Sequence, residues 1–198
     1  MRTRPGVRTA LLAVGLAVLL AACGGQGSLP VVGEAPDFTL RTIDGAPFHL
    51  HDDTGAVRLI SFIYTNCPTE CPAMTHWMLA VQKKLKADGV PPEKVRFYSI
   101  TFDPEKDTPE AMRAFLERFR YDGETLDWPY WRALTGSPEE TRGVVRAFGL
   151  LVQPSNDGLF IHSDRVVLVD GEGKIRALYP GSTLPVDDVY RDMKRLIR

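Results

Sequence analysis

The stretch VRLISFIYTNCPTECPAMTHWMLAVQKKL, residues 57–85, decides the fold of this chain. Its first part, residues 57–64, is a continuous apolar run rich in β-branched and aromatic residues. Such a run predicts a buried strand and is typical of a parallel sheet. The second part carries apolar residues at helical spacing: Met74, Met78, Val81 and Leu85. Two cysteines, Cys67 and Cys71, lie where the predicted strand gives way to the predicted helix.

The two thiols are expected at the N-terminus of a helix, where the helix dipole and free N–H groups favour the thiolate. The i, i+4 spacing of Cys67 and Cys71 would put both on one helical face if both belong to the helix. Three interpretations compete. A structural disulfide suits an oxidising compartment, but it would close a short loop and stabilise little. A redox-active dithiol suits the helix N-terminus, and a metal site would require a third ligand.

His162 is the candidate for that third ligand. It follows an irregular, exposed loop predicted over residues 150–160 and precedes an apolar run at residues 165–169. In α/β sheets, reactive groups gather at the carboxyl ends of the strands, so His162 can meet the cysteines there. Two thiolates and one imidazole form a soft ligand set that favours Cu(I), whereas a structural zinc site takes four protein ligands. The alternative is an ordinary histidine that faces solvent or has a hydrogen-bond partner.

The remaining pattern predicts an α/β domain. Strands are expected at residues 94–101 and 131–134, hairpins at residues 38–50 and 165–178, and helices after Thr108, after the Ser137–Glu140 capping box and over residues 186–197. Strands that alternate with helices favour a mixed, mostly parallel central sheet flanked by helices. The first hairpin adds an N-terminal antiparallel element to that sheet.

The N-terminal segment reads as an export signal. A basic start precedes an apolar run at residues 10–20, which is too short to span a bilayer as a helix. The run ends in LAAC at residues 20–23, a tetrapeptide that resembles the bacterial lipoprotein signal, in which the cysteine is lipidated. The alternative is an ordinary secretory signal, and both predict an exported protein. We therefore expect three segments: a signal peptide at residues 1–22, a lipid-anchored tether at residues 23–35 that begins with lipidated Cys23, and one domain at residues 36–198.

Charge and motifs exclude several classes of function. The formal net charge is −1, and no basic run or stripe indicates a nucleic-acid partner. The sequence has no phosphate-binding loop, no glycine-rich nucleotide fingerprint and no G-x-S-x-G motif.

Four motifs resemble the Sco/SenC family, in the family's order and over the chain from about residue 36 onward. They are FIYTNCPTECPAMT at residues 62–75, TFDPEKDTPE at residues 101–110, LTG at residues 134–136, and His162-Ser163 ahead of an apolar strand that ends in Asp170. The resemblance implies a thioredoxin-like fold and a membrane-tethered copper chaperone for the binuclear copper centre of cytochrome c oxidase. It implies that Cys67, Cys71 and His162 bind one copper ion, as Cu(I) or Cu(II).

The resemblance also implies the partners: the oxidase subunit that carries the binuclear copper site, another periplasmic copper carrier, and the membrane through the lipid anchor. The protein would be a cell-membrane lipoprotein facing the extracytoplasmic or periplasmic side, and not an enzyme. One departure concerns Ile161, because the family often has an aspartate before its histidine. Asp157 or Asp164 is a candidate to supply that carboxylate. The competing hypothesis is a thiol–disulfide oxidoreductase that uses Cys67 and Cys71 as a redox-active dithiol and reduces the cysteines of the copper centre.

Overall fold

A computed structural model of the chain describes residues 29–198. The predicted signal peptide, the lipidation of Cys23 and the start of the tether lie outside the described residues. In the described part, no helix combines the length and the apolar character needed to cross a lipid bilayer.

The centre of the fold is strand β4 (Val57–Ile63), in which every residue is buried. It pairs in parallel with β5 (Val95–Thr101), and β5 pairs in parallel with β8 (Trp131–Thr135). These are the strands predicted from the apolar runs. Because all three point the same way, their carboxyl ends meet at one edge of the sheet, and the cysteines follow the end of β4.

Two hairpins and the short strand β1 (Gly33–Glu34) extend this core into an eight-stranded mixed sheet with the order β1-β12-β11-β4-β5-β8-β2-β3. On one side β11 (Arg165–Val169) and β12 (Lys174–Pro180) are added, and on the other β2 (Thr39–Thr42) and β3 (Pro47–His49). The mixed α/β fold with an N-terminal hairpin is confirmed. The "mostly parallel" part of that prediction is wrong, because within residues 29–198 two pairings of this sheet are parallel and five are antiparallel. A short turn can join antiparallel neighbours only, so each hairpin adds antiparallel pairs.

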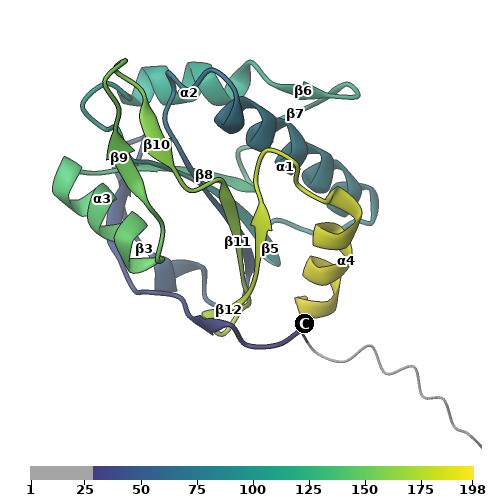
Figure 1. The fold of residues 1–198 in the computed structure, drawn as a ribbon. Coiled ribbons are helices and arrows are strands. Elements are labelled where there is room, and N and C mark those ends of the chain that lie inside the picture. The colour runs from purple at the N-terminus through teal and green to yellow at the C-terminus, as the bar shows by residue number, and fades with distance from the viewer. Residues whose placement is uncertain (1–28) are drawn as a thin grey trace, which may run out of the picture.

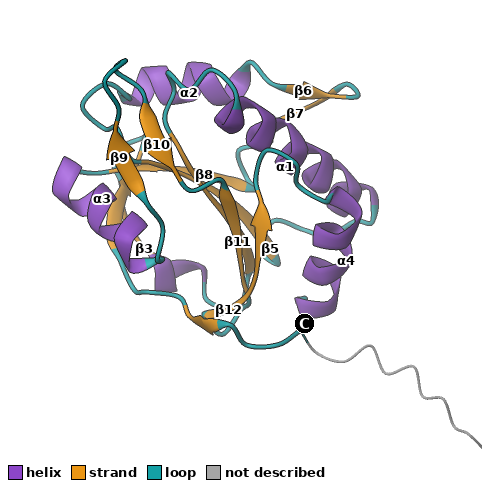
Figure 2. Ribbon diagram, viewed as in Figure 1, coloured by secondary structure: helices purple, strands orange, loops and turns teal. Residues whose placement is uncertain are grey.

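Helices flank the sheet (Figures 1 and 2). They are α1 (Glu70–Ala87), α2 (Pro109–Glu117), α3 (Pro138–Ala147) and α4 (Val186–Leu196). Helices α1 and α4 pack side by side on one side, and α3 lies on the other. The predicted caps are present: the Thr108 hydroxyl accepts the N–H of Ala111 at 3.2 Å, and Ser137 and Glu140 form the capping box.

The loop prediction for residues 150–160 is wrong. This segment contains β9 (Val152–Pro154), which pairs antiparallel with β10 (Phe160–His162) in a separate two-stranded sheet. The strands are three residues long, too short to show an alternating pattern in sequence. A second small hairpin, also missed, joins β6 (Arg120–Tyr121) to β7 (Glu124–Thr125) beside α1.

The last part of the predicted tether already belongs to the sheet. Strand β1 (Gly33–Glu34) pairs antiparallel with β12, and the N–H of Val32 donates to the carbonyl of Ile175 at 2.8 Å. The 3-10 helix η1 (Leu50–Asp53) then connects β3 to the glycine turn before β4. In the described chain, the ordered domain therefore begins a few residues before the predicted boundary at residue 36.

Candidate metal site

The turn after β4 places the first cysteine. The N–H of Cys67 donates to the carbonyl of Tyr64 at 3.2 Å, which closes a tight turn directly after the strand. Helix α1 then begins at Glu70, with Thr69 as its N-cap residue. Cys71 is therefore in the first turn of the helix, whereas Cys67 precedes it. The condition for one shared helical face is not met, because the helix starts after Cys67.

The two cysteines nevertheless meet through the helix N-terminus. The Thr69 side chain makes no capping hydrogen bond, and the backbone N–H of Cys71 donates instead to Cys67 Sγ at 3.3 Å. The first N–H groups of a helix have no partner within the helix, so the Cys67 sulfur satisfies one of them. Both thiols are free in this structure, and Cys67 is 3% and Cys71 0% exposed.

The imidazole comes from the other side of the site. His162 ends β10, opposite Val152 of β9, and its side chain is half-buried. Its ring packs edge-on against Tyr64, with 5.8 Å between centroids, and is tilted against Phe102 at 5.4 Å. Phe160, two residues earlier on the same face of β10, contacts the same two aromatic rings at 5.1 and 5.3 Å. These contacts dock the β9–β10 hairpin with His162 facing the cysteines.

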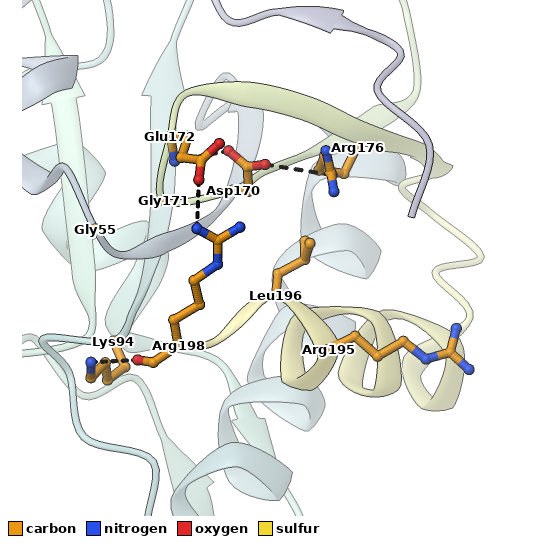
Figure 3. A pocket seen from close by; sticks show the side chains of 9 residues that line it. All are labelled: Gly55, Lys94, Asp170, Gly171, Glu172, Arg176, Arg195, Leu196 and Arg198. Atoms are coloured by element: carbon orange, nitrogen blue, oxygen red, sulfur yellow. Dashed lines mark hydrogen bonds and ion pairs between the residues drawn. The ribbon is translucent and has the colours of Figure 1, made fainter. Parts of the chain in front are cut away.

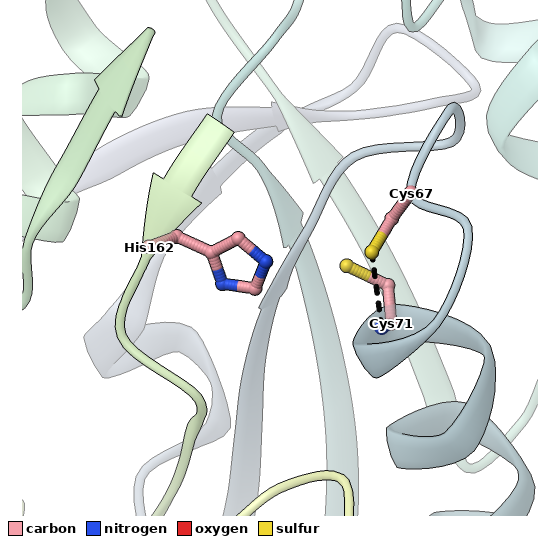
Figure 4. Close-up of side chains that lie close together, drawn as sticks. All are labelled: Cys67, Cys71 and His162. Carbon is pink, nitrogen blue, oxygen red and sulfur yellow. Dashed lines mark hydrogen bonds between the residues drawn. The ribbon is translucent and has the colours of Figure 1, made fainter. Parts of the chain in front are cut away.

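The structure brings the three predicted residues together. The two sulfur atoms and one imidazole nitrogen all lie within 4.8 Å of one another. Figure 4 shows the imidazole of His162 facing the two sulfurs across the gap between the β10 segment and the start of α1. Within residues 29–198 this is the one group of three or more histidine, cysteine or acidic side chains that is close enough to hold a metal ion. Its two sulfurs and one nitrogen suit a soft, low-coordinate metal.

The two thiols differ in pKa. The pKa of Cys67 is lowered, chiefly because its sulfur accepts a hydrogen bond from the Cys71 thiol. His162 and backbone N–H groups lower it further, while burial acts in the opposite direction. Burial raises the pKa of the Cys71 thiol well above its usual value, and the hydrogen bond to Cys67 adds to this effect. The pKa of His162 is raised, first by its hydrogen bond with Cys67. Cys67 is therefore the more acidic of the two thiols, and the imidazole of His162 lies beside it.

The carboxylates considered as substitutes for an aspartate at position 161 are engaged elsewhere. Asp164 accepts hydrogen bonds from the N–H of Ser182 at 2.8 Å and from its hydroxyl at 2.5 Å. Asp157 accepts the N–H of Leu159 in the turn between β9 and β10. Neither belongs to the three-residue cluster. The acidic side chain beside the cysteines is instead Glu70, whose Oε2 lies 3.6 Å from Cys67 Sγ.

The aromatic residues around His162 were not predicted from the sequence. Tyr64 and Phe102 each follow the last residue of a parallel strand, β4 and β5, and the N–H of Phe102 donates to the carbonyl of Ile63 at 3.1 Å. Adjacent parallel strands that end together must place these two aromatic side chains near the cysteines. Their position at the ends of two predicted strands was therefore a usable signal. The position of Phe160 depends on the hairpin, which the sequence pattern does not reveal.

A separate pocket of about 310 Å³ lies at the opposite edge of the sheet (Figure 3). Gly55 and Lys94, just before β4 and β5, and Asp170, just after β11, are among its lining residues. Its two acidic side chains each pair with an arginine of the lining: Glu172 with Arg198 at 2.5 Å and Asp170 with Arg176 at 3.5 Å. It has neither a thiol nor an imidazole among its lining residues, so it is not a second site for a soft metal.

The chain is similar to known proteins over most of its length. The SCO1/SenC family model matches residues 31–198. The SCO1 protein homolog of Bacillus subtilis (strain 168) is 36% identical over 189 residues, which cover 92% of this chain and 94% of that protein. The structure of BsSco, described as a member of the Sco family of cytochrome c oxidase assembly proteins, is 35% identical, with a TM-score of 0.71 over 85% of this chain and 96% of that one. The structure of Arabidopsis thaliana ScoI with copper bound is 28% identical, with a TM-score of 0.68 over 81% and 96% of the two chains.

The opposed pKa shifts predict two separate thiol ionisations in the reduced protein. Ultraviolet thiolate absorbance should show one step below the ordinary thiol pKa of about 8.5 and a second step above it. As the pH falls from neutrality, the Cys67 signal should therefore persist. Cys67→Ser should remove the lower step. His162→Ala should move that step upward, because the imidazole no longer stabilises the thiolate. Two thiols that ionise together near the ordinary value would contradict this assignment.

Proposed function

Because the chain belongs to the SCO1/SenC family, we propose that it is an extracytoplasmic copper chaperone. It binds one copper ion through Cys67, Cys71 and His162 and delivers it to the binuclear copper centre of cytochrome c oxidase. The observation that carries this proposal is the approach of two sulfurs and one imidazole nitrogen to within 4.8 Å in the interior of the domain. The related BsSco is described as an oxidase assembly protein and the related ScoI as copper-bound, which supports the same function for this chain.

The donor set fits copper on chemical grounds. Thiolates and imidazole bind Cu(I) well, and three ligands give the low coordination number that this ion accepts. Copper is the cargo here, so a site with few ligands is useful because the ion must also leave. Loading requires both thiols in the thiolate form, and the Cys71 proton must therefore be released when the metal enters. Cys67 loses its proton more readily than Cys71, since its pKa is lowered.

The ligands come from two separately held segments, which suggests how copper is released. Cys67 and Cys71 are fixed by the turn after β4 and the start of α1, whereas His162 is carried by the β9–β10 hairpin. Movement of this hairpin would withdraw the imidazole and leave copper on two thiolates, open to a ligand from the partner. Phe160 faces inward against Tyr64 and Phe102, so the residue that β10 presents to a partner is Ile161, which is 59% exposed.

Thiol–disulfide exchange is the second candidate function. The specific observation in its favour is the lowered pKa of Cys67 next to the buried Cys71 thiol, an arrangement that suits a nucleophilic thiol with a resolving partner. In this role the pair would reduce the cysteines of the target's copper centre. The two functions separate at His162, because dithiol exchange needs both cysteines but no imidazole ligand.

The proposal for the protein's location rests on the N-terminal sequence. We place the protein at the cell membrane, facing the extracytoplasmic side, with a lipid on Cys23 as its anchor. Its partners are the oxidase subunit that carries the binuclear copper site or another periplasmic copper carrier. An anchored chaperone meets a membrane-bound target at a raised effective concentration.

Copper titration of the reduced domain tests the ligand set. We expect one Cu(I) per chain, measured by competition with a chromophoric chelator. Cys67→Ser and Cys71→Ser should each abolish tight binding, because each leaves one thiolate. His162→Ala should weaken binding at least about tenfold, or about 1.4 kcal/mol, because one of three ligands is lost.

His76→Ala is the matched control for His162→Ala. The His76 ring lies on α1 and contacts the carbonyl of Arg120 at 3.1 Å, away from the sulfur atoms. This variant should bind copper like the parent. If His162→Ala also binds copper like the parent, while both cysteines remain necessary, the oxidoreductase becomes the better assignment.

The anchor should be needed for delivery but not for binding. A soluble form that begins at Pro30 keeps β1 and its pairing with β12, so its domain should bind copper as the full chain does. In cells, this form should support less oxidase assembly than the lipoprotein, because it is no longer held near the membrane. The comparison uses equal amounts of the two forms in a strain that lacks the native protein, with oxidase activity as readout. Equal assembly by both forms would show that the anchor makes no contribution.

A further inference from the structure

Asp107 is a buried acidic residue beside the turn that carries Cys67. It lies between the end of β5 and the start of α2, and it is 1% exposed. Its Oδ1 accepts the backbone N–H of Thr65 at 3.0 Å and the Thr65 hydroxyl at 2.5 Å. Its Oδ2 accepts the hydroxyl of Thr101, the last residue of β5. One buried carboxylate thus ties the segment after β4 to the segment after β5.

The carboxylate depends on these three donors. Within residues 29–198, no lysine, arginine or histidine lies within ion-pair distance of Asp107. A buried charge without a cationic partner is tolerated only when hydrogen bonds replace the lost water. Its backbone is held as well, because the N–H of Asp107 donates to the carbonyl of Asp103 at 2.9 Å. Asp107 is therefore a fixed acceptor that binds both the backbone N–H and the hydroxyl of Thr65.

Thr65 is the residue through which this anchor reaches the site. It is the second residue of the turn that the Cys67 N–H closes onto the Tyr64 carbonyl. Fixing both the N–H and the hydroxyl of Thr65 sets the orientation of this turn. The orientation of this turn then determines where the Cys67 sulfur lies. The sulfur is 3.3 Å from the backbone nitrogen of Cys71 and close to the His162 ring.

We propose that Asp107 is a positioning residue for the dithiol and metal site, acting through Thr65 to hold the turn that carries Cys67. The part of the proposal that concerns copper rests on the proposed function, whereas the part that concerns the dithiol does not. Hydrogen-bonded partners behind a ligand typically matter for metal affinity, because they hold the ligand in its binding orientation.

The substitutions can be graded. Asp107→Ala leaves the Thr65 N–H and two hydroxyl groups without their acceptor; the Thr101 hydroxyl is buried and the Thr65 groups are part-buried. Asp107→Asn keeps one carbonyl oxygen for Thr65 and presents an amide NH₂ to Thr101, whose hydroxyl oxygen can accept it. Thr65→Val removes one of the two Thr65 bonds and leaves the backbone N–H bond. We expect effects in the order Asp107→Ala, then Thr65→Val and Asp107→Asn.

The first measurement is the reduction potential of the Cys67–Cys71 couple, in which two thiols lose two protons and two electrons to form a disulfide. It is measured against mixtures of oxidised and reduced dithiothreitol. Hydrogen bonds from the Cys71 thiol, from His162 and from the Cys71 N–H stabilise the Cys67 thiolate of the reduced form. A displaced Cys67 loses part of that stabilisation, so Asp107→Ala should make the potential more negative. Adding Thr65→Val to Asp107→Ala should cause no further change, because both act through one contact.

The second measurement is Cu(I) affinity, which Asp107→Ala should weaken roughly 10- to 100-fold, the usual cost of losing a partner behind a ligand. Thr108→Ala is the matched control. It removes the cap of α2 one residue away, where the Thr108 hydroxyl accepts the Ala111 N–H, and it leaves the two hydrogen bonds from Thr65 to Asp107 in place. This variant should lose thermal stability and yet keep the parent potential and copper affinity.

The outcomes separate the proposals. A folded Asp107→Ala protein with the parent's potential and copper affinity would overturn the role of Asp107. If Asp107→Ala does not fold, Asp107→Asn and Thr65→Val decide the question, and parent-like values in both would overturn it. If Thr108→Ala shifts the potential as Asp107→Ala does, general destabilisation is the cause and the proposal is wrong. If the parent binds no copper, the proposed function fails, while the potential still tests Asp107.

Discussion

The hydrogen bond from the Cys71 N–H to Cys67 Sγ is the contact on which the rest of the site depends. It exists because the chain leaves a buried parallel strand, makes one tight turn and enters a helix whose N-cap side chain makes no capping bond. The helix needs an acceptor at its first turn, and the Cys67 sulfur supplies it. The same contact favours the thiolate, so one element of local structure both caps α1 and prepares a metal ligand.

The surrounding fold brings the third ligand to this position. The parallel strands β4 and β5 end at the same edge, where Tyr64 and Phe102 form an aromatic wall. The β9–β10 hairpin packs Phe160 and His162 against that wall, which turns the imidazole toward the sulfurs. Because the cysteines and the histidine belong to separately held segments, the domain can keep two ligands in place while the third moves. This division of the ligands suits a protein that must release its metal.

Much of this arrangement can be predicted from the sequence, and the parts that cannot be predicted have physical causes. The apolar run ending at Tyr64, the caps at Thr108 and Ser137, and the pair Cys67 and Cys71 are local patterns with direct structural meaning. His162 is distant in sequence and was predicted from its place just before a strand. The short strands of the β9–β10 hairpin are held by tertiary contacts of Phe160, so no local period reveals them. Asp107 has the appearance of a turn residue in sequence, since its partner Thr65 lies 42 residues away. The antiparallel pairing of β11 with β4 likewise joins segments that are distant in sequence, so no local pattern predicts it.

X-ray absorption at the copper edge of the copper-loaded, reduced domain tests the central claim most directly, because it reports the atoms bound to the metal. Two thiolates and one imidazole predict a low-coordinate site dominated by sulfur scattering, with one imidazole contribution that His162 supplies. A copper ion surrounded by oxygen and nitrogen neighbours alone, without sulfur, would contradict the assignment of this site.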